Sequence, residues 1–354
     1  MHNEHRIDLP KRVIVGTRII DNIGVIVKEM QLGSHALIVS GTTSTLSYAK
    51  IVAESLEDKG IDCWNMYVAK SSKEEVEKTI AMLREVGANT IVGVGGGKAL
   101  DVAKYTAATT DKYFISVPTS PSHDGIASPF ASIRDMGRPT SIKAATPVLV
   151  LADVEIISRA PRRNIIAGCC DLLGKFSSVL DWRLAHKLRG EYYGDYAASL
   201  ALLSAKHILK NSELFEEKTF TLEAIRILVE ALISSGIAMA IAGSTRPASG
   251  SEHMIAHAID IVANYPALHG EEVGIGTIIS LYLHGRNWKK IRSVLRKIGA
   301  PTTAREIGVS LDKIVEALSI AHTIRPERYT ILGEKGISKE AAEKIVKVTG
   351  IAEE

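Results

Sequence analysis

The chain has 354 residues, of which 46% are hydrophobic and 23% are charged, a composition typical of folded proteins rather than disordered ones. The formal net charge of +3 is small for this length, and no Lys/Arg run with interleaved aromatic residues occurs. A nucleic-acid partner is therefore not expected, and the length allows two domains of ordinary size.

Three features bear on the cellular compartment. Residues 1–6 are polar and lack the apolar segment of a secretory signal. The charge-free apolar stretch 231–243 is too short to span a bilayer and favours a buried helix. Three cysteines (Cys63, Cys169 and Cys170) cannot make a disulfide framework. We therefore predict a cytoplasmic protein with no membrane insertion.

From residue 36 the spacing of apolar residues alternates between strand and helix. It predicts strands over 36–39, 90–94 and 113–117, and helices over 46–56, over 73–86 and from about Gly97. Ser72 and Glu75 form a capping box at the start of the second helix. This alternation predicts an α/β domain, a parallel sheet with helices on both faces.

A triple glycine, Gly95-Gly96-Gly97, joins one predicted strand to its helix. Glycines let backbone N–H groups approach a pyrophosphate, and a helix N-terminus adds partial positive charge. The segment is not a P-loop, because Val92 and Ala99 stand where that motif needs Gly and Ser/Thr, and Lys98 breaks a GxGxxG pattern. A tight turn is the alternative, but the position in an α/β sheet favours a phosphate loop.

Two further loops follow predicted strands and should lie at the same edge of the sheet. The hydroxyl groups of 119–122 could reach the phosphates or ribose of a dinucleotide, although a plain Ser/Pro/Gly loop would look similar. Residues 40–43 (Ser-Gly-Thr-Thr) offer no acid to bind a ribose 2′-hydroxyl. A 2′-phosphate should not be repelled there, so both NAD(H) and NADP(H) are expected to bind.

The rest of the chain changes character. Residues 126–150 are irregular and strand-like, with a turn signal at 135–137, and the apolar run breaks near Pro161. Helical spacing then predicts helices over 195–209, 222–241, 273–283 and 341–348. We predict an NAD(P)-binding α/β domain over 1–160 and an all-helical metal- and substrate-binding domain over 161–354.

Histidines cluster in the predicted helical half. His253 and His257 are four apart, on one face of a helix, and His269 follows beyond a Tyr-Pro break. Asp171 lies in an apolar run, a costly place for a carboxylate unless a positive group meets it. One carboxylate and two of these imidazoles would make a three-ligand catalytic metal site.

Other interpretations of these residues are structural. Isolated histidines often only pack, and Asp171 with Lys175, one turn away, could be a surface ion pair. The HExxH motif of zinc proteases is absent, since Glu252 precedes His253 instead of following it. Peptide hydrolysis is therefore disfavoured.

Five motifs resemble those of the superfamily of glycerol dehydrogenases, iron-type alcohol dehydrogenases and dehydroquinate synthases. Within it they are most similar to the sn-glycerol-1-phosphate dehydrogenases, and the likeness runs from the first strand to residues 325–330. The motifs cover residues 95–101, 118–125, 170–175, 249–253 and 268–271.

The resemblance implies metal-assisted, NAD(P)-dependent reduction of dihydroxyacetone phosphate to sn-glycerol 1-phosphate, for archaeal lipid synthesis, by a cytoplasmic homo-oligomer. It implies zinc on Asp171, His253 and His269, although such ligands also suit iron or nickel. It implies that Asp124, Asp171 and His257 are catalytic residues, with Asp124 in contact with the substrate and His257 near it. The residues it implies for the cofactor are Gly97, Lys98, Ala99, Leu100, Asp101, Thr119, Ser120, Pro121, Ser122 and Ser128.

Several alternatives stay open at this stage. The substrate phosphate needs cationic partners, and Lys175, Arg246, Arg325 and Arg328 are all candidates. A glycerol dehydrogenase would act on the unphosphorylated substrate and would not need them. Two other kinds of protein would share the fold. One is a cyclase of the dehydroquinate synthase type, and the other is a sensor that binds the nucleotide but has no catalytic activity.

Overall fold

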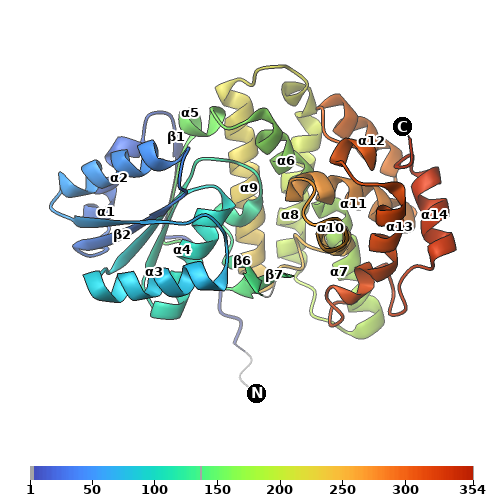
Figure 1. Cartoon of the computed structure of the whole chain (residues 1–354), viewed down its shortest axis with the longest axis horizontal. Coiled ribbons are helices and arrows are strands. Elements are labelled where there is room, and N and C mark those ends of the chain that lie inside the picture. Colours follow the sequence, from blue (N-terminus) through green and yellow to red (C-terminus); the bar gives the residue numbers. More distant parts are fainter. Residues whose placement is uncertain (1–3, 136–137, 354) are drawn as a thin grey trace. The chain divides into compact units, whose positions relative to one another are not determined.

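A parallel six-stranded sheet, in the order β1-β8-β5-β4-β2-β3, forms the centre of the first part of the chain in this computed structural model (Figure 1). The structure describes residues 4–135 and 138–353. The strands of the sheet are β1 (Arg12–Gly16), β2 (His35–Ser40), β3 (Asp62–Tyr67), β4 (Thr90–Gly95), β5 (Tyr113–Pro118) and β8 (Leu149–Asp153).

Helices cover both faces of this sheet (Figure 1). On β4, Val92 and Val94 pack into the core shared with α1 and α2, whereas Gly93 lies against side chains of α4. This follows from the strand geometry, in which successive residues point to opposite faces. The helices here are α1 (Ile23–Glu29), α2 (Leu46–Glu57), α3 (Lys73–Val86), α4 (Gly97–Thr110) and α5 (Val154–Ser158), with short 3-10 turns η1 (Ile20–Asn22) and η2 (Asp124–Ile126).

The order of the strands creates a switch point. From β2 the chain moves outward to β3 and then returns to place β4 on the opposite side of β2. The loops that follow β2 and β4 therefore lead to helices on opposite faces of the sheet, and the crevice between such loops is where open α/β sheets bind ligands. The glycine loop after β4 and the loop after β2 both lie there, and the Gly95 α-carbon faces the Thr45 side chain.

The predicted α/β class with a helical second half is confirmed, but individual strands were missed. β1 and β3 are edge strands, and β3 (DCWNMY) has mostly polar or half-exposed residues, so it lacks the apolar run of a central strand. In the stretch predicted as irregular and strand-like, β6 (Phe130–Asp135) and β7 (Arg138–Lys143) form a two-stranded antiparallel sheet, and β8 follows. The turn predicted at 135–137 falls partly on residues outside the described ones.

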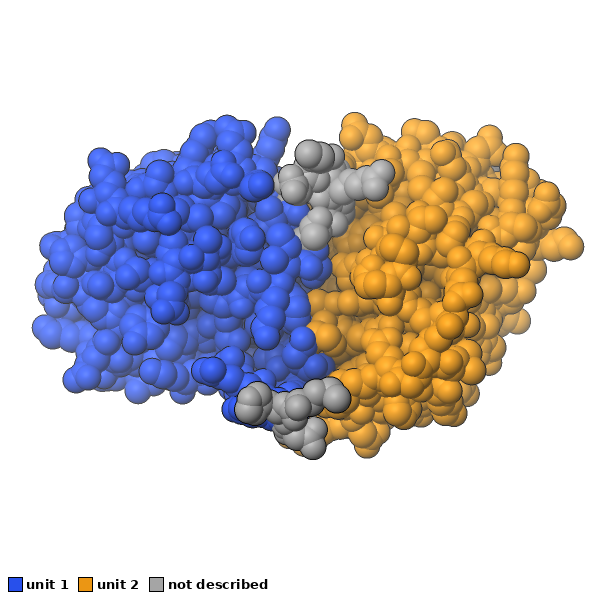
Figure 2. Space-filling view, turned by 90° about the horizontal axis from the view of Figure 1, so that it is seen from below, with its two compact units in different colours: residues 1–160, 221–243 blue, residues 161–220, 244–354 orange. Residues whose placement is uncertain are grey.

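The chain divides into two compact units (Figure 2). One comprises the residues up to Ala160 together with Thr221–Gly243, and the other comprises Pro161–Phe220 together with the residues from Ser244 onward. The predicted domain 161–354 therefore differs at α9 (Leu222–Ala242), which packs with β1, α5 and η2 of the first unit. α9 carries charges only at Glu223, Arg226 and Glu230 and is otherwise apolar or small, so its sequence could not indicate which core it joins.

α9 is long and apolar enough to cross a membrane by length and composition. In its most apolar 18-residue window, 67% of the residues are buried inside the protein. This is the burial expected of a core helix in a globular domain.

The described residues of the second unit form helices and no strands. α11 packs against both α6 and α10, and these three helices carry the predicted metal ligands. The helices are α6 (Arg162–Leu173), α7 (Lys175–Arg189), α8 (Asp195–Lys210), α10 (Ser251–Ala263), α11 (His269–Leu283), α12 (Trp288–Lys297), α13 (Leu311–Ile320) and α14 (Lys339–Val348), with η3 (Ser212–Phe215), η4 (Arg305–Ile307) and η5 (Ala321–Thr323).

Candidate metal centre and cofactor loop

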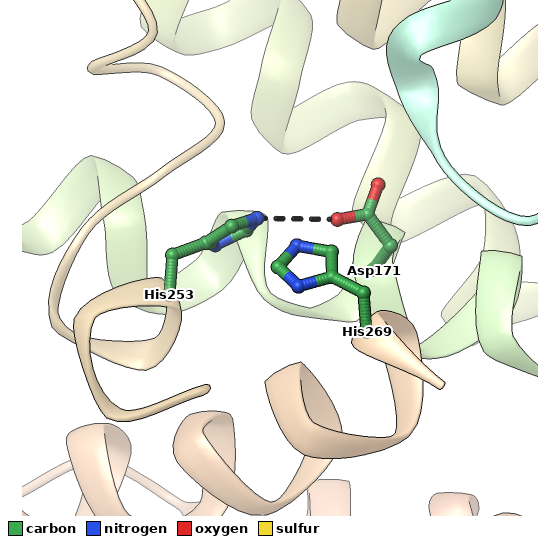
Figure 3. Close-up of side chains that lie close together, drawn as sticks. All are labelled: Asp171, His253 and His269. Carbon is green, nitrogen blue, oxygen red and sulfur yellow. Dashed lines mark ion pairs between the residues drawn. The ribbon is translucent and has the colours of Figure 1, made fainter. Parts of the chain in front are cut away.

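The second unit brings Asp171, His253 and His269 together from three helices (Figure 3). Asp171 lies in the last turn of α6, His253 in the first turn of α10, and His269 begins α11. One ligand atom from each lies within 4.8 Å of the others, and His253 Nε2 is 3.4 Å from an Asp171 carboxylate oxygen. One carboxylate and two imidazoles suit a divalent cation of the zinc or iron type.

The carboxylate of this set is held ionised inside the protein. Burial alone would raise the pKa of Asp171, but the Lys175 ammonium, 3.1 Å away, and the His253 imidazole hold that pKa well below its usual range. Asp171 and Lys175 are both fully buried, so the surface ion pair considered from the sequence is wrong. An ionised carboxylate is the form that binds a metal cation.

Glu252 orients the first imidazole, a role that the sequence interpretation missed. Its carboxylate is fully buried, lies 2.8 Å from His253 Nδ1, and accepts hydrogen bonds from Gly250 N–H and the Ser177 hydroxyl. Without a metal, burial alone would lower the pKa of His253, but hydrogen bonds to Asp171 and Glu252 raise it. In the neutral tautomer that donates Nδ1–H to Glu252, the lone pair of His253 is on Nε2, which faces Asp171. Carboxylates commonly hold metal-binding histidines in this way. The acidic residue beside His253 was the available signal.

A network at the start of α11 fixes His269. Glu271 accepts a hydrogen bond from the Leu268 N–H at 2.9 Å, and Arg163 donates two to the same carboxylate, at 2.5 and 2.6 Å. Burial and the neighbouring His253 and His257 lower the pKa of His269 well below its usual value. The imidazole is therefore neutral at pH 7, the form that binds metals.

A second set of donor atoms overlaps the first. His257, Asp260 and His269 also bring one ligand atom each within 4.8 Å. Here, however, Asp260 faces a protonated neighbour, since burial and the Asp260 charge raise the pKa of Glu272 to about 10. His257 Nδ1 is 3.5 Å from Asp260 and makes no hydrogen bond among the described residues. The first set, with its hydrogen-bonded Glu252, fits a bound cation better.

The close approach of α6 and α11 depends on Gly270. A Cβ at this position would lie 2.1 Å from the backbone oxygen of Ala167, so Gly270→Ala must displace a helix. We expect it to lower the free energy of unfolding by about 1–3 kcal/mol or more. Gly274→Ala is the matched control on the same helix, because its Cβ would make only ordinary contacts at 3.5 Å or more. Denaturant unfolding of both variants measures the difference, and equal stability would contradict this packing.

In the first unit, the glycine loop has the features of an anion site. β4 ends at Gly95, whose φ of +154° favours glycine, and α4 begins at Gly97 after Gly96. Because Gly96 has no side chain to cap the helix, the first N–H groups of α4 remain available to an anion. A Cβ at Gly97 would lie 2.3 Å from His123 Nε2, so a larger residue would have to displace the imidazole of the next loop.

The residues implied for the cofactor lie around this loop with different exposures. Lys98 is exposed, and Gly97, Ser120 and Ser122 are half-buried. The remaining members are buried: Ala99, Leu100, Asp101, Thr119, Pro121 and Ser128.

Lys104, on α4, links Asp101 to the segment 125–130, and this role was not predicted from the sequence. It is fully buried, lies 3.7 Å from Asp101, and donates hydrogen bonds to the carbonyls of Gly125 and Phe130. The Asp101 carboxylate is therefore buried and paired with the Lys104 ammonium. Asp124, implied as a substrate contact, is also buried and accepts a hydrogen bond from Ser235 of α9 at 2.8 Å.

Comparison with known proteins adds independent evidence. Residues 14–161 match the model of the family described as iron-containing alcohol dehydrogenase. The chain is 52% identical to glycerol-1-phosphate dehydrogenase [NAD(P)+] of Sulfurisphaera tokodaii and 51% identical to that of Aeropyrum pernix, in each case over 98% of both chains.

Solved structures share the fold. A probable glycerol dehydrogenase from Sinorhizobium meliloti aligns with a TM-score of 0.81 at 22% identity, over 98% of both chains. Glycerol dehydrogenase from Schizosaccharomyces pombe aligns with a TM-score of 0.79 at 21% identity, over 98% of this chain and 90% of that one. At these identities the likeness concerns the fold alone.

Proposed function

The chain belongs to the glycerol-1-phosphate dehydrogenase family, and on this premise we propose that it reduces dihydroxyacetone phosphate to sn-glycerol 1-phosphate with NADH or NADPH. The observation that carries the proposal is the convergence of Asp171, His253 and His269 beside His257, in a chain half identical to such enzymes. This convergence also argues against a sensor that has lost its chemistry.

In this proposal Asp171, His253 and His269 hold one divalent cation, zinc by resemblance, while iron and nickel suit the same donors. When bound, the cation supplies Lewis-acid polarisation of the substrate carbonyl. Glu252 keeps the His253 Nε2 lone pair directed to the site, and Lys175 keeps Asp171 ionised.

His257 is the proposed proton carrier. Its ring centroid lies 5.2 Å from that of His269, one helical turn along α10 from His253. Reduction turns the carbonyl oxygen into an alkoxide, which needs a proton, and a positioned imidazole can donate or relay it. We assign Asp124 to contact the substrate, held in place by the Ser235 hydroxyl.

The glycine loop of the first unit is the proposed cofactor site. The N–H groups at the start of α4 bind the pyrophosphate, with Lys98 and the 119–122 loop beside them. Ser128 completes the set. When bound, the reduced nicotinamide supplies the hydride.

Both cofactors should support turnover. β2 ends in Ser40-Gly41-Thr42, with no carboxylate to grip a 2′-hydroxyl or repel a 2′-phosphate. Comparing kcat/KM for NADH and NADPH at saturating dihydroxyacetone phosphate measures the preference. We expect the two values to lie within about a thousandfold, and a larger preference for NADH would refute the argument.

The direct test of the function is a substrate comparison. Purified enzyme is assayed with NADPH and either dihydroxyacetone phosphate or dihydroxyacetone, and the handedness of the product is determined. We expect steady NADPH consumption with the phosphate and a product of the sn-1 configuration. Preference for the unphosphorylated ketone would instead identify a glycerol dehydrogenase, and no net NADPH consumption with either would favour a cyclase.

The proposal extends to the cellular role. The product is the glycerol phosphate backbone of archaeal membrane lipids, so we place the enzyme at the start of that synthesis. All three cysteines are free, which suits the reducing cytoplasm. We further propose a homo-oligomer, the assembly implied by the family resemblance.

A further inference from the structure

Two arginines after η5 converge on the segment that leads into α10. Arg328 donates to the Thr245 hydroxyl at 2.8 Å and to the Ser249 carbonyl at 2.7 Å. Arg325 donates to the Ser249 hydroxyl at 3.3 Å, and the Thr245 hydroxyl is 3.5 Å from the same nitrogen. The two guanidinium groups thus share their partners, and these are neutral oxygens.

No carboxylate of the described residues lies within ion-pair distance of Arg325 or Arg328. Burial, Arg325 and Arg246 together lower the pKa of Arg328 to about 9, and burial lowers the pKa of Arg325 as well. Two neighbouring cations are costly in a partly buried position, and the Glu327 carboxylate, which raises the pKa of both, lies beyond ion-pair distance. An anion arriving from solvent would offset that cost.

The other two cations considered from the sequence already have partners. Lys175 is fully buried, lies 3.1 Å from Asp171, and donates to the Ala248 carbonyl. Arg246 is buried and bound by the Glu191 carboxylate. Neither can approach a new anion without giving up a buried ionic contact.

The arginine pair contacts the segment that leads into the helix carrying His253 and His257. Ser249 is two residues before α10, which carries His253 and His257, and α10 packs against η5 and α13. After burial, the charge of Arg325 is the largest influence that lowers the pKa of His257, and Arg328 adds to it. An anion held by this pair would therefore lie near His257.

We propose that Arg325 and Arg328, with the hydroxyl groups of Thr245 and Ser249, bind the phosphate group of the substrate. This assignment rests on the proposed function, since it names the subsite that separates a phosphorylated from an unphosphorylated three-carbon ketone. Each guanidinium offers several N–H donors in a planar fork that matches phosphate oxygens. The two hydroxyls accept from the arginines, which leaves their O–H groups free to donate to the phosphate.

The test compares two substrates in Arg325→Gln and Arg328→Gln. We expect each variant to lose about 10- to 100-fold in kcat/KM for dihydroxyacetone phosphate, mainly through KM. In the KM for unphosphorylated dihydroxyacetone and in the KM for NADPH, we expect changes of less than about threefold. Arg305→Gln is the matched control, because Arg305 is exposed in η4 and its side chain makes no hydrogen bond or ion pair among the described residues.

Different results would contradict the phosphate subsite and the proposed function. Equal losses for both ketones, an altered KM for NADPH alone, or no loss at all would overturn the subsite. A wild-type enzyme that reduces dihydroxyacetone but not its phosphate would overturn the proposed function itself.

A measurement on the wild-type protein guards against misfolded variants. Inorganic phosphate should compete with dihydroxyacetone phosphate and raise the melting temperature of the wild type, and Arg325→Lys or Arg328→Lys should retain part of this effect. Absence of competition in the wild type would contradict the subsite without any variant.

Discussion

Replacing His253 or His269 with alanine is expected to abolish metal binding and turnover together. Each supplies one of the three ligand atoms within 4.8 Å of one another, so either variant leaves only two ligands in the Asp171 set. Loss of Lewis-acid assistance, worth several kcal/mol, should lower kcat about a thousandfold or more.

Metal content by elemental analysis after dialysis, measured alongside turnover, checks this prediction. His207→Ala is the matched control, because His207 is exposed on α8 and lies outside both donor sets. Full activity in a metal-stripped sample of the wild type would overturn the mechanism.

His257→Ala should behave differently, retaining the metal while losing turnover. His257 lies outside the Asp171 set, and its imidazole is the proposed proton carrier. Loss of a positioned acid–base group typically costs about 10²–10⁴ in rate. The measurement is again metal content together with kcat.

Comparing His253→Ala with His257→Ala also shows which of the two overlapping donor sets binds the ion. If the ion sits among His257, Asp260 and His269, then His257→Ala loses the metal and His253→Ala keeps it. That pattern would contradict the assignment of His253 as a ligand.

The elements that could be predicted from the sequence are those with strong periodicity and clear ends. The helix predicted over 73–86 begins after Ser72, whose hydroxyl accepts the Glu75 N–H, and ends at Gly87 with φ of +66°. Only half of the predicted capping box is present there, because the Glu75 carboxylate faces the Ala69 N–H instead. The glycine loop was predicted for the same reason, since a strand, three glycines and a helix are contiguous in the chain.

What could not be predicted depends on contacts between distant segments. Asp171 meets His253 and His269 only because α11 packs on α6 and α10, with Gly270 and Gly276 lying against backbone atoms. Residue types and spacing suggested a metal site, but the choice of ligands came from family resemblance. The roles of Glu252 and Lys104 are likewise invisible until the fold places their partners.

The most direct test of the account is anomalous X-ray scattering at the metal absorption edge, from crystals of active enzyme. We expect one strong peak per chain, within coordinating distance of Asp171, His253 and His269. A peak coordinated elsewhere, or no peak in crystals whose dissolved protein is active, would contradict it.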